Sequence, residues 1–274
     1  MGNPGQTRIV PSIMQSRRVV AIVPAYNEAE RLEKTIAALW TIRQIRNVLV
    51  VDDGSTDDTA AVAFRAGAEC ISLGRNRGKG AALNAGIATT RGYVVSARWQ
   101  APAAVLLADA DLGPSAHILA RLVEPVLGGD VDLAIADLPP QLRAGGFGLV
   151  KKMARMGLRA KGAGDIREPL SGQRAVAWAA LPALTPFAPG FGVEVQMTID
   201  ALAAGLKFVE ITLPLTHAVT GKGVAGALHR GTQAVAVARV LVRATITFDM
   251  PKRTLRRWIV RVARDVGSDR CPPP

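Results

Sequence analysis

Two carboxylates separated by one small residue are the clearest candidates for metal chemistry in this sequence. Asp109-Ala110-Asp111 directly follows the apolar run Val105-Leu106-Leu107-Ala108, which has the length of a buried strand. Strand side chains alternate in direction, so Asp109 and Asp111 are expected to point the same way. Hard oxygen ligands suit Mg²⁺ or Mn²⁺, and such an ion can neutralise a diphosphate leaving group. Taken alone, the pattern also fits a polar turn that caps a helix.

A short basic turn is the second candidate, and phosphate is its expected ligand. Asn76-Arg77-Gly78-Lys79-Gly80 precedes a helix-like segment from Ala81 to Ala88. Backbone amides at a helix N-terminus, together with the Lys79 ammonium, can meet phosphate oxygens. The spacing is not that of a Walker P-loop, and no dinucleotide-binding glycine fingerprint accompanies the first strand. A dinucleotide oxidoreductase is therefore disfavoured, and a flexible basic turn without a ligand is the simpler alternative.

Both segments lie in a part of the chain where expected strands and helices alternate. Val19–Val23 and Val48–Val51 are apolar runs that stop at Pro24 and Asp52. Further strands are expected near residues 70–73, 105–108, 133–136 and 207–213. The alternation predicts an α/β fold with a mostly parallel sheet and helices on both faces. Ligands of such sheets bind at the carboxyl ends of strands, so the turns at Pro24 and Asp52 join the candidate site.

Composition narrows the class of protein without choosing a partner. With 274 residues, of which 49% are hydrophobic and 4% aromatic, the chain suits one α/β domain with a helical extension. A net charge of +12 favours anionic partners, but no nucleic-acid-binding signature is present, so no nucleic-acid partner is expected. Cys70 and Cys271 do not resemble a disulfide framework, and neither a signal peptide nor a spanning segment is evident. We expect a cytoplasmic protein.

Four strand-end motifs occur in the order typical of glycosyltransferase family 2. They are Pro24-Ala25-Tyr26-Asn27-Glu28, Val51-Asp52-Asp53-Gly54-Ser55-Thr56-Asp57, Gly78-Lys79-Gly80 and Asp109-Ala110-Asp111. The chain resembles this family from about Arg18 to His217, and four motifs together are more specific than any one alone. The resemblance implies a GT-A fold, a nucleotide-sugar donor, with UDP favoured, and a divalent cation, Mg²⁺ or Mn²⁺.

The resemblance also implies roles for single residues. The donor-binding residues would be Pro24, Ala25, Glu28, Asp52, Asp53, Lys79 and Asp109. Among these, Lys79 would face the donor phosphates and Asp109 the ribose or the metal, while Asp111 would be a metal ligand. Structural alternatives remain open for two of them: Asp52 could cap the following helix, and Glu28 could be an acid at a helix N-terminus.

A second group of motifs follows in the later half of the chain. It comprises Leu170-Ser171-Gly172-Gln173-Arg174, Gly190-Phe191-Gly192-Val193-Glu194 and, after an apolar strand, His217. This order resembles glucosyl-3-phosphoglycerate synthases and polyprenyl-phosphate glycosyltransferases. By resemblance to the first group, His217 would complete the metal site, and Glu194 would lie by the reacting sugar. The predicted catalytic residues are Glu194 and Asp111. The alternatives are a surface or packing histidine and a polar residue on a helix face.

The predicted domain organisation has four parts. Residues 1–16 form a flexible arm, 17–225 the catalytic domain, 226–267 a C-terminal helical extension and 268–274 a tail. Within the catalytic domain, residues 17–136 are the nucleotide-sugar half and 137–225 the acceptor half. An apolar stripe flanked by arginines in residues 252–266 suits contact with the inner face of a membrane, with a second subunit in a homodimer, or with the catalytic domain. The acceptor would be a phosphorylated small molecule or a polyprenyl phosphate.

Two other functions compete with glycosyl transfer. A regulator that binds a nucleotide sugar without turnover is one, and the intact Asp109, Asp111 and Lys79 argue against it. A nucleotidyltransferase is the other, and it would need a glycine-rich basic loop after the first strand, where Pro24–Glu28 stands. The sequence therefore predicts a metal-dependent glycosyltransferase.

Overall fold

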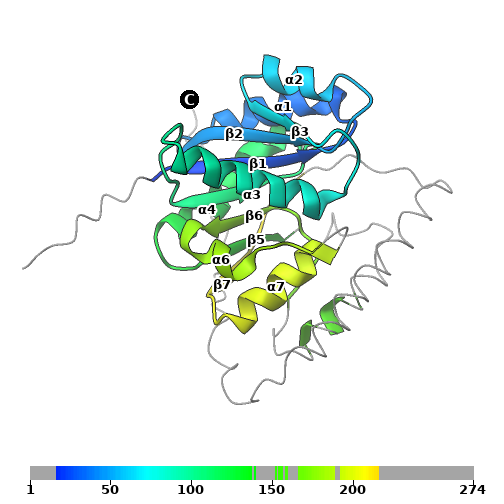
Figure 1. Cartoon of the computed structure of the whole chain (residues 1–274). Coiled ribbons are helices and arrows are strands. Elements are labelled where there is room, and N and C mark those ends of the chain that lie inside the picture. The colour runs from blue at the N-terminus through cyan, green and yellow to red at the C-terminus, as the bar shows by residue number, and fades with distance from the viewer. Residues whose placement is uncertain are drawn as a thin grey trace, which may run out of the picture.

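The chain folds around one seven-stranded sheet (Figure 1). The computed structural model describes residues 17–137, 166–188 and 192–215, with positions 139, 152, 154–156 and 158–159 between them. The strands are β1 (Val19–Ala25), β2 (Ile45–Asp52), β3 (Glu69–Ser72), β4 (Ala104–Leu107), β5 (Leu133–Asp137), β6 (Arg174–Ala177) and β7 (Phe208–Thr212). Their order is β3-β2-β1-β4-β6-β5-β7, and every neighbouring pair is parallel except the two that β6 makes. The predicted mostly parallel sheet is confirmed.

Helices cover both faces of this sheet, as the alternating sequence pattern predicts. One face carries α1 (Ala29–Trp40), α2 (Thr59–Arg65), the 3-10 helix η1 (Gly113–Leu119) and α4 (Ala120–Leu127). The other carries α3 (Lys79–Val95), the 3-10 helix η3 (Trp178–Ala180), α6 (Leu181–Leu184) and α7 (Val193–Ala203). In β1, Val19 and Val23 pack in the first core while Val20 and Ile22 pack in the second. Both faces of this central strand are thus apolar, which explains its unbroken hydrophobic run.

Two details of the fold differ from the prediction. The helix after the basic turn begins at Lys79 instead of Ala81 and continues to Val95. Strand β6 was not predicted, because its apolar residues continue without a break into the helices that follow, and such a run cannot be divided into strand and helix by pattern alone. It runs antiparallel between β4 and β5, with Arg174 opposite Leu107 and Ile135.

The antiparallel direction of β6 determines where the functional motifs meet. The first residue of β6 lies at the edge of the sheet where β1, β2 and β4 end, since Arg174 pairs with Leu107 and Leu107 pairs with Ile22. The motifs that follow β1, β2 and β4 therefore share one edge with the motif that precedes β6. This edge is the crevice position where open α/β sheets bind ligands.

Several predicted parts lie outside the described residues. They are the arm, residues 1–16, the C-terminal extension, residues 226–267, the tail, residues 268–274, and His217. The two halves of the catalytic domain remain a prediction. Within the part of the chain that the structure describes, no helix is long and apolar enough to cross a membrane.

Candidate functional site

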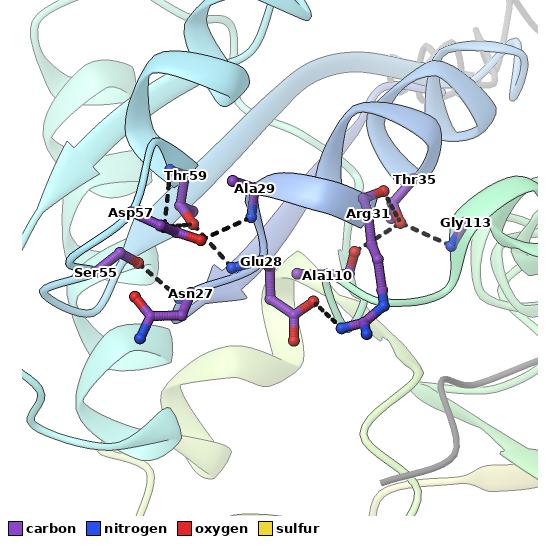
Figure 2. Close-up of polar contacts among 10 residues, drawn as sticks. All are labelled: Asn27, Glu28, Ala29, Arg31, Thr35, Ser55, Asp57, Thr59, Ala110 and Gly113. Carbon is purple, nitrogen blue, oxygen red and sulfur yellow. Dashed lines mark hydrogen bonds and ion pairs between the residues drawn. The ribbon is translucent and has the colours of Figure 1, made fainter.

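The turns after β1 and β2 are tied to each other by side-chain hydrogen bonds (Figure 2). The Asn27 amide donates to Ser55 Oγ at 2.9 Å, and Asn27 Oδ1 accepts from the Thr56 amide at 2.8 Å. The amide of Ala29, at the start of α1, donates to Asp57 Oδ2 at 3.2 Å. Burial acts to raise the pKa of Asp57, but its hydrogen bonds with Thr59 and the Ala29 amide lower it below the ordinary value. The turn carrying Ala25 and Glu28 is thereby fixed by the next turn along the sheet.

Asp53 holds the basic turn against the end of β2. Its two carboxylate oxygens accept hydrogen bonds from the amides of Arg77 and Gly78, each at 2.7 Å. Asp53 is buried, so these charge-assisted bonds are shielded from water. The contact of Asp53 with a nucleoside remains a prediction, whereas its hydrogen bonds to the turn before Lys79 are present in the structure.

Asp52 is also buried, and its bonds are local to the same edge. Its carboxylate accepts from the Ser55 amide and from the Ser72 hydroxyl, both at 2.9 Å. The alternative in which Asp52 caps the following helix is wrong, because Asp58 occupies the N-cap position of α2. Asp52 instead shapes the turn after β2 by bonding to the residue three positions later.

Lys79 brings three predicted site residues together. Its Nζ lies 2.6 Å from Asp109 Oδ1 and 2.9 Å from Glu194 Oε1, so one ammonium bridges the end of β4 and the first turn of α7. Burial acts to lower the pKa of Lys79, but the two carboxylates raise it above the ordinary value. The lysine is therefore charged at neutral pH, and its side chain is 22% exposed.

Two neighbours of this cluster had been given no role from the sequence. Gln173 is buried, and its Nε2 donates to Asp109 Oδ2 at 2.8 Å. A Cβ on Gly172 would collide with Lys79 Nζ and would lie 2.9 Å from both carboxylate oxygens of Asp109. Gly172 and Gln173 are part of the later sequence motif, but their contacts with Asp109 and Lys79 depend on strand β6, which was not predicted.

Glu28 and Asp111 lie close enough to interact electrostatically, and Asp111 is in the turn after β4 that also carries Asp109, here called the Asp109 turn. The Glu28 carboxylate pairs with Arg31 Nη1 at 3.2 Å, within α1 and its N-cap (Figure 2). Burial raises the pKa of Glu28, and the negative charge of Asp111 raises it further. Glu28 is the N-cap residue of α1, although its side chain makes no capping hydrogen bond. Its position agrees with the alternative of an acid at a helix N-terminus, and its contact with a donor remains a prediction.

Asp109 and Asp111 fit a hard divalent cation by the chemistry of their oxygens. Both side chains are partly buried at the end of β4, with Glu28 within electrostatic reach. Protein sites for Mg²⁺ often supply only one or two carboxylates and leave the other positions to water and substrate phosphates. Within the described residues, no three histidine, cysteine or acidic side chains gather closely enough to hold an ion by themselves. Ligand phosphates, or the predicted His217 outside that part, would complete the coordination.

Comparisons with known proteins agree with this geometry. A family model described as "Glycosyl transferase family 2" matches residues 20–153. Glucosyl-3-phosphoglycerate synthase of Mycobacterium tuberculosis is 30% identical over 207 residues, which are 67% of this chain and 60% of that protein. The chain belongs to glycosyltransferase family 2. The predicted family is thus confirmed.

Two further relatives have other names. Glycosyltransferase AglJ of Haloferax volcanii is 31% identical over 196 residues, covering 69% of this chain and 60% of that protein. Dolichyl-phosphate beta-glucosyltransferase of Homo sapiens is 37% identical over 126 residues, 39% of this chain and 36% of the relative. The chain thus spans about 60% of the length of the first relatives that it matches.

Solved structures of the mycobacterial synthase have the same fold. The complex with Mn²⁺, UDP and glucosyl-3-phosphoglycerate has a TM-score of 0.66 and 26% identity, over 83% of this chain and 80% of the other. The complex with Mg²⁺ and UDP has a TM-score of 0.68 and 27% identity, over 83% and 79%. The GT-A-like fold of this family 2 glycosyltransferase is confirmed, while the roles assigned to its single residues remain predictions.

Proposed function

We propose that this family 2 glycosyltransferase transfers a hexose from a UDP-hexose to a phosphorylated acceptor with the help of Mg²⁺ or Mn²⁺. The observation that carries the proposal is the cluster of Lys79, Asp109 and Glu194 at the carboxyl edge of the sheet. It joins the residue assigned to phosphate, a residue assigned to the metal and the residue assigned to the reacting sugar. The complexes of the similar synthase with UDP and Mn²⁺ or Mg²⁺ support the same donor and cation.

The nucleoside would lie along the turns after β1 and β2. Pro24 and Ala25 end β1, and Glu28 follows in the first turn as the N-cap of α1. Asp52 ends β2, and Asp53 begins the second turn. These turns are fixed before any ligand arrives by the hydrogen bonds between them. A fixed binding surface saves the entropy of ordering loops on binding, which favours affinity for the donor.

The diphosphate would lie between the basic turn and the Asp109 turn. Asp109, Asp111 and the predicted His217 would hold the cation, which when bound neutralises charge that develops on the departing diphosphate. Lys79 is charged and lies beside Asp109, so it can donate to phosphate oxygens once its present partners release it. Glu194 is buried in the first turn of α7, and its carboxylate contacts Lys79 Nζ. This contact supports a role for Glu194 beside the reacting sugar.

Two acceptors are proposed, in order of support. A small phosphorylated acid is favoured, because the similar synthase has been solved with phosphoglyceric acid and covers 83% of this chain. A polyprenyl phosphate is the second candidate, and the 37% identity to dolichyl-phosphate beta-glucosyltransferase supports it over a shorter segment. In both, an oxygen of the acceptor bonds to the anomeric carbon while the bond from that carbon to the donor diphosphate breaks and UDP leaves. A phosphate oxygen attacks as an anion, whereas the proton of an attacking hydroxyl would pass to Glu194 or to a phosphate oxygen of the donor.

A ligand screen followed by a transfer assay tests this proposal. UDP-sugars and the matching GDP- and ADP-sugars are compared by thermal shift with and without Mn²⁺, because a bound donor stabilises the folded protein by mass action. The stabilising donor is then offered with phosphoglycerate or with a short polyprenyl phosphate in detergent. A UDP-sugar that stabilises only with Mn²⁺ and is transferred to one of them is the expected result. Stabilisation without transfer to any acceptor would favour a binding protein without turnover.

A further inference from the structure

Thr35 connects helix α1 to the turn that carries Asp111 (Figure 2). Its side chain is fully buried, on the face of α1 that also buries Leu32 and Ile36. The Thr35 hydroxyl donates to the carbonyl of Ala110 at 2.7 Å and accepts from the amide of Gly113 at 2.8 Å. These two backbone groups flank Asp111 on its two sides.

The Thr35 hydroxyl is a polar group on a face of α1 whose other buried side chains are apolar. Packing alone would favour a valine of the same shape, because a buried polar group must find partners to offset the loss of water. The hydroxyl also lies 3.4 Å from the Arg31 carbonyl in its own helix, but its two shorter hydrogen bonds are with the turn after β4, 75 and 78 residues further along the chain. Gly113 has a positive φ of 54°, so the turn is tight where its amide meets the hydroxyl. The backbone on both sides of Asp111 is thereby fixed by a side chain from another element.

We propose that Thr35 is a positioning residue for Asp111 and sets the affinity of the site for a divalent cation. The inference rests on the proposed function, in which Asp111 is a metal ligand. The carboxylate of Asp109 is held by hydrogen bonds from Lys79 and Gln173, neither of which involves Thr35. Loss of the Thr35 hydroxyl should therefore loosen Asp111 while leaving the Asp109 side chain in place. Groups that orient metal ligands typically contribute about 10–100-fold to metal affinity.

Two substitutions separate the hydroxyl from the shape of the side chain. Thr35→Val removes the hydroxyl and keeps the branched form, whereas Thr35→Ser keeps the hydroxyl. Thr90→Val is the matched control: Thr90 is also fully buried, and its hydroxyl donates to the Gly86 carbonyl within α3 at 2.8 Å, away from the Asp111 turn. Mn²⁺ binding to the full chain is titrated by electron paramagnetic resonance with saturating UDP. Calorimetry measures UDP binding without metal.

The expected result is selective. Thr35→Val should weaken Mn²⁺ binding by about 10–100-fold, leave metal-free UDP binding unchanged, and reach the wild-type kcat at saturating Mn²⁺. Thr35→Ser should restore most of the metal affinity, and Thr90→Val should match the wild type. Should Thr35→Val fail to fold, Thr35→Ala carries the same comparison.

Three results would overturn the inference. Mn²⁺ affinity of Thr35→Val within about twofold of the wild type is the first, since an orienting group contributes more than that. An equal loss of metal-free UDP binding is the second, because it would show a general structural role. If the wild type itself binds no Mn²⁺ with UDP, the proposed metal dependence fails and the inference fails with it, a result distinguishable from the other two.

Discussion

Replacing Lys79 by methionine should strengthen Mn²⁺ binding to the nucleotide-free protein while it weakens UDP binding. The Lys79 ammonium lies 2.6 Å from Asp109 Oδ1, so it competes with a metal ion for the same carboxylate. It also pairs with Glu194 at 2.9 Å, and its removal leaves both carboxylates without that neutralising charge. Methionine keeps an unbranched chain of similar length and removes only the ammonium.

The size of the effect follows from the partial exposure of the pair. The side chains of Lys79 and Asp109 are 22% and 30% exposed, between a surface pair and a buried one. Exposed pairs contribute about 0.2–1 kcal/mol, and removing one partner of a buried pair costs about 3–5 kcal/mol. A value of about 1–2 kcal/mol is reasonable here, which corresponds to a rise in Mn²⁺ affinity of about 5–30-fold.

The assay is a Mn²⁺ titration without nucleotide, followed by calorimetry with UDP and with uridine. Lys34→Met is the control, because Lys34 is an exposed lysine on α1 and its loss removes the same formal charge. Lys79→Met should bind UDP more weakly than the wild type and bind uridine about equally. Metal affinity no higher than in the Lys34→Met control would refute the competition. Equal losses for UDP and uridine would refute the phosphate role of Lys79.

Three further predictions concern other side chains of the described residues. Gly172→Ala should lower kcat by about 10–100-fold, because the new Cβ would displace the Lys79 ammonium at an overpacking cost of about 1–3 kcal/mol; an unchanged kcat would show that the cluster tolerates the shift. Glu194→Gln should lower kcat far more than UDP affinity, and a change in affinity alone would assign Glu194 to binding. Burial raises the pKa of the Cys70 thiol from 9.0 to about 11. In a Cys271→Ser background, alkylation at pH 8 should therefore be about 100-fold slower than for an unperturbed cysteine, and its rate should keep rising above pH 10; a rate that levels off by pH 10 would contradict the shift.

The parallel part of the sheet could be predicted because its strands are buried on both faces. Val19–Val23 and Val48–Val51 are unbroken apolar runs, and each ends at a polar turn. Strand β6 could not be predicted, since its apolar residues continue into the following helices and its first residue, Arg174, is charged. The Arg174 side chain is fully buried and donates to the Ser171 carbonyl at 2.9 Å and to Thr198 Oγ1 at 3.0 Å. Burial lowers the pKa of Arg174 to about 10, and only tertiary contacts make such a position tolerable.

In the candidate site, too, some features could be predicted from the sequence and others could not. Asp109 and Lys79 could be selected from their positions at a strand end and a helix start, which collect at one edge of an α/β sheet. Glu194 was selected by the resemblance to glucosyl-3-phosphoglycerate synthases. The contacts among these three residues were not predictable, since Lys79 was expected to face phosphate and instead pairs with both carboxylates. Gln173 was missed for a related reason: its hydrogen bond to Asp109 depends on the antiparallel direction of β6.

Transfer of radiolabelled glucose from UDP-glucose, compared between the wild type and Asp111→Ala, is the most direct test of metal-dependent glycosyl transfer. The wild type should release UDP and label phosphoglycerate or a polyprenyl phosphate with Mn²⁺, and should do neither with excess chelator. Asp111→Ala should lose nearly all of this activity and keep its unfolding midpoint, because a partly exposed side chain in the turn after β4 contributes little to the core. The control Asp130→Ala, in an exposed turn after α4, should retain the wild-type rate. Full Mn²⁺-dependent transfer by Asp111→Ala would contradict the assignment of the metal site.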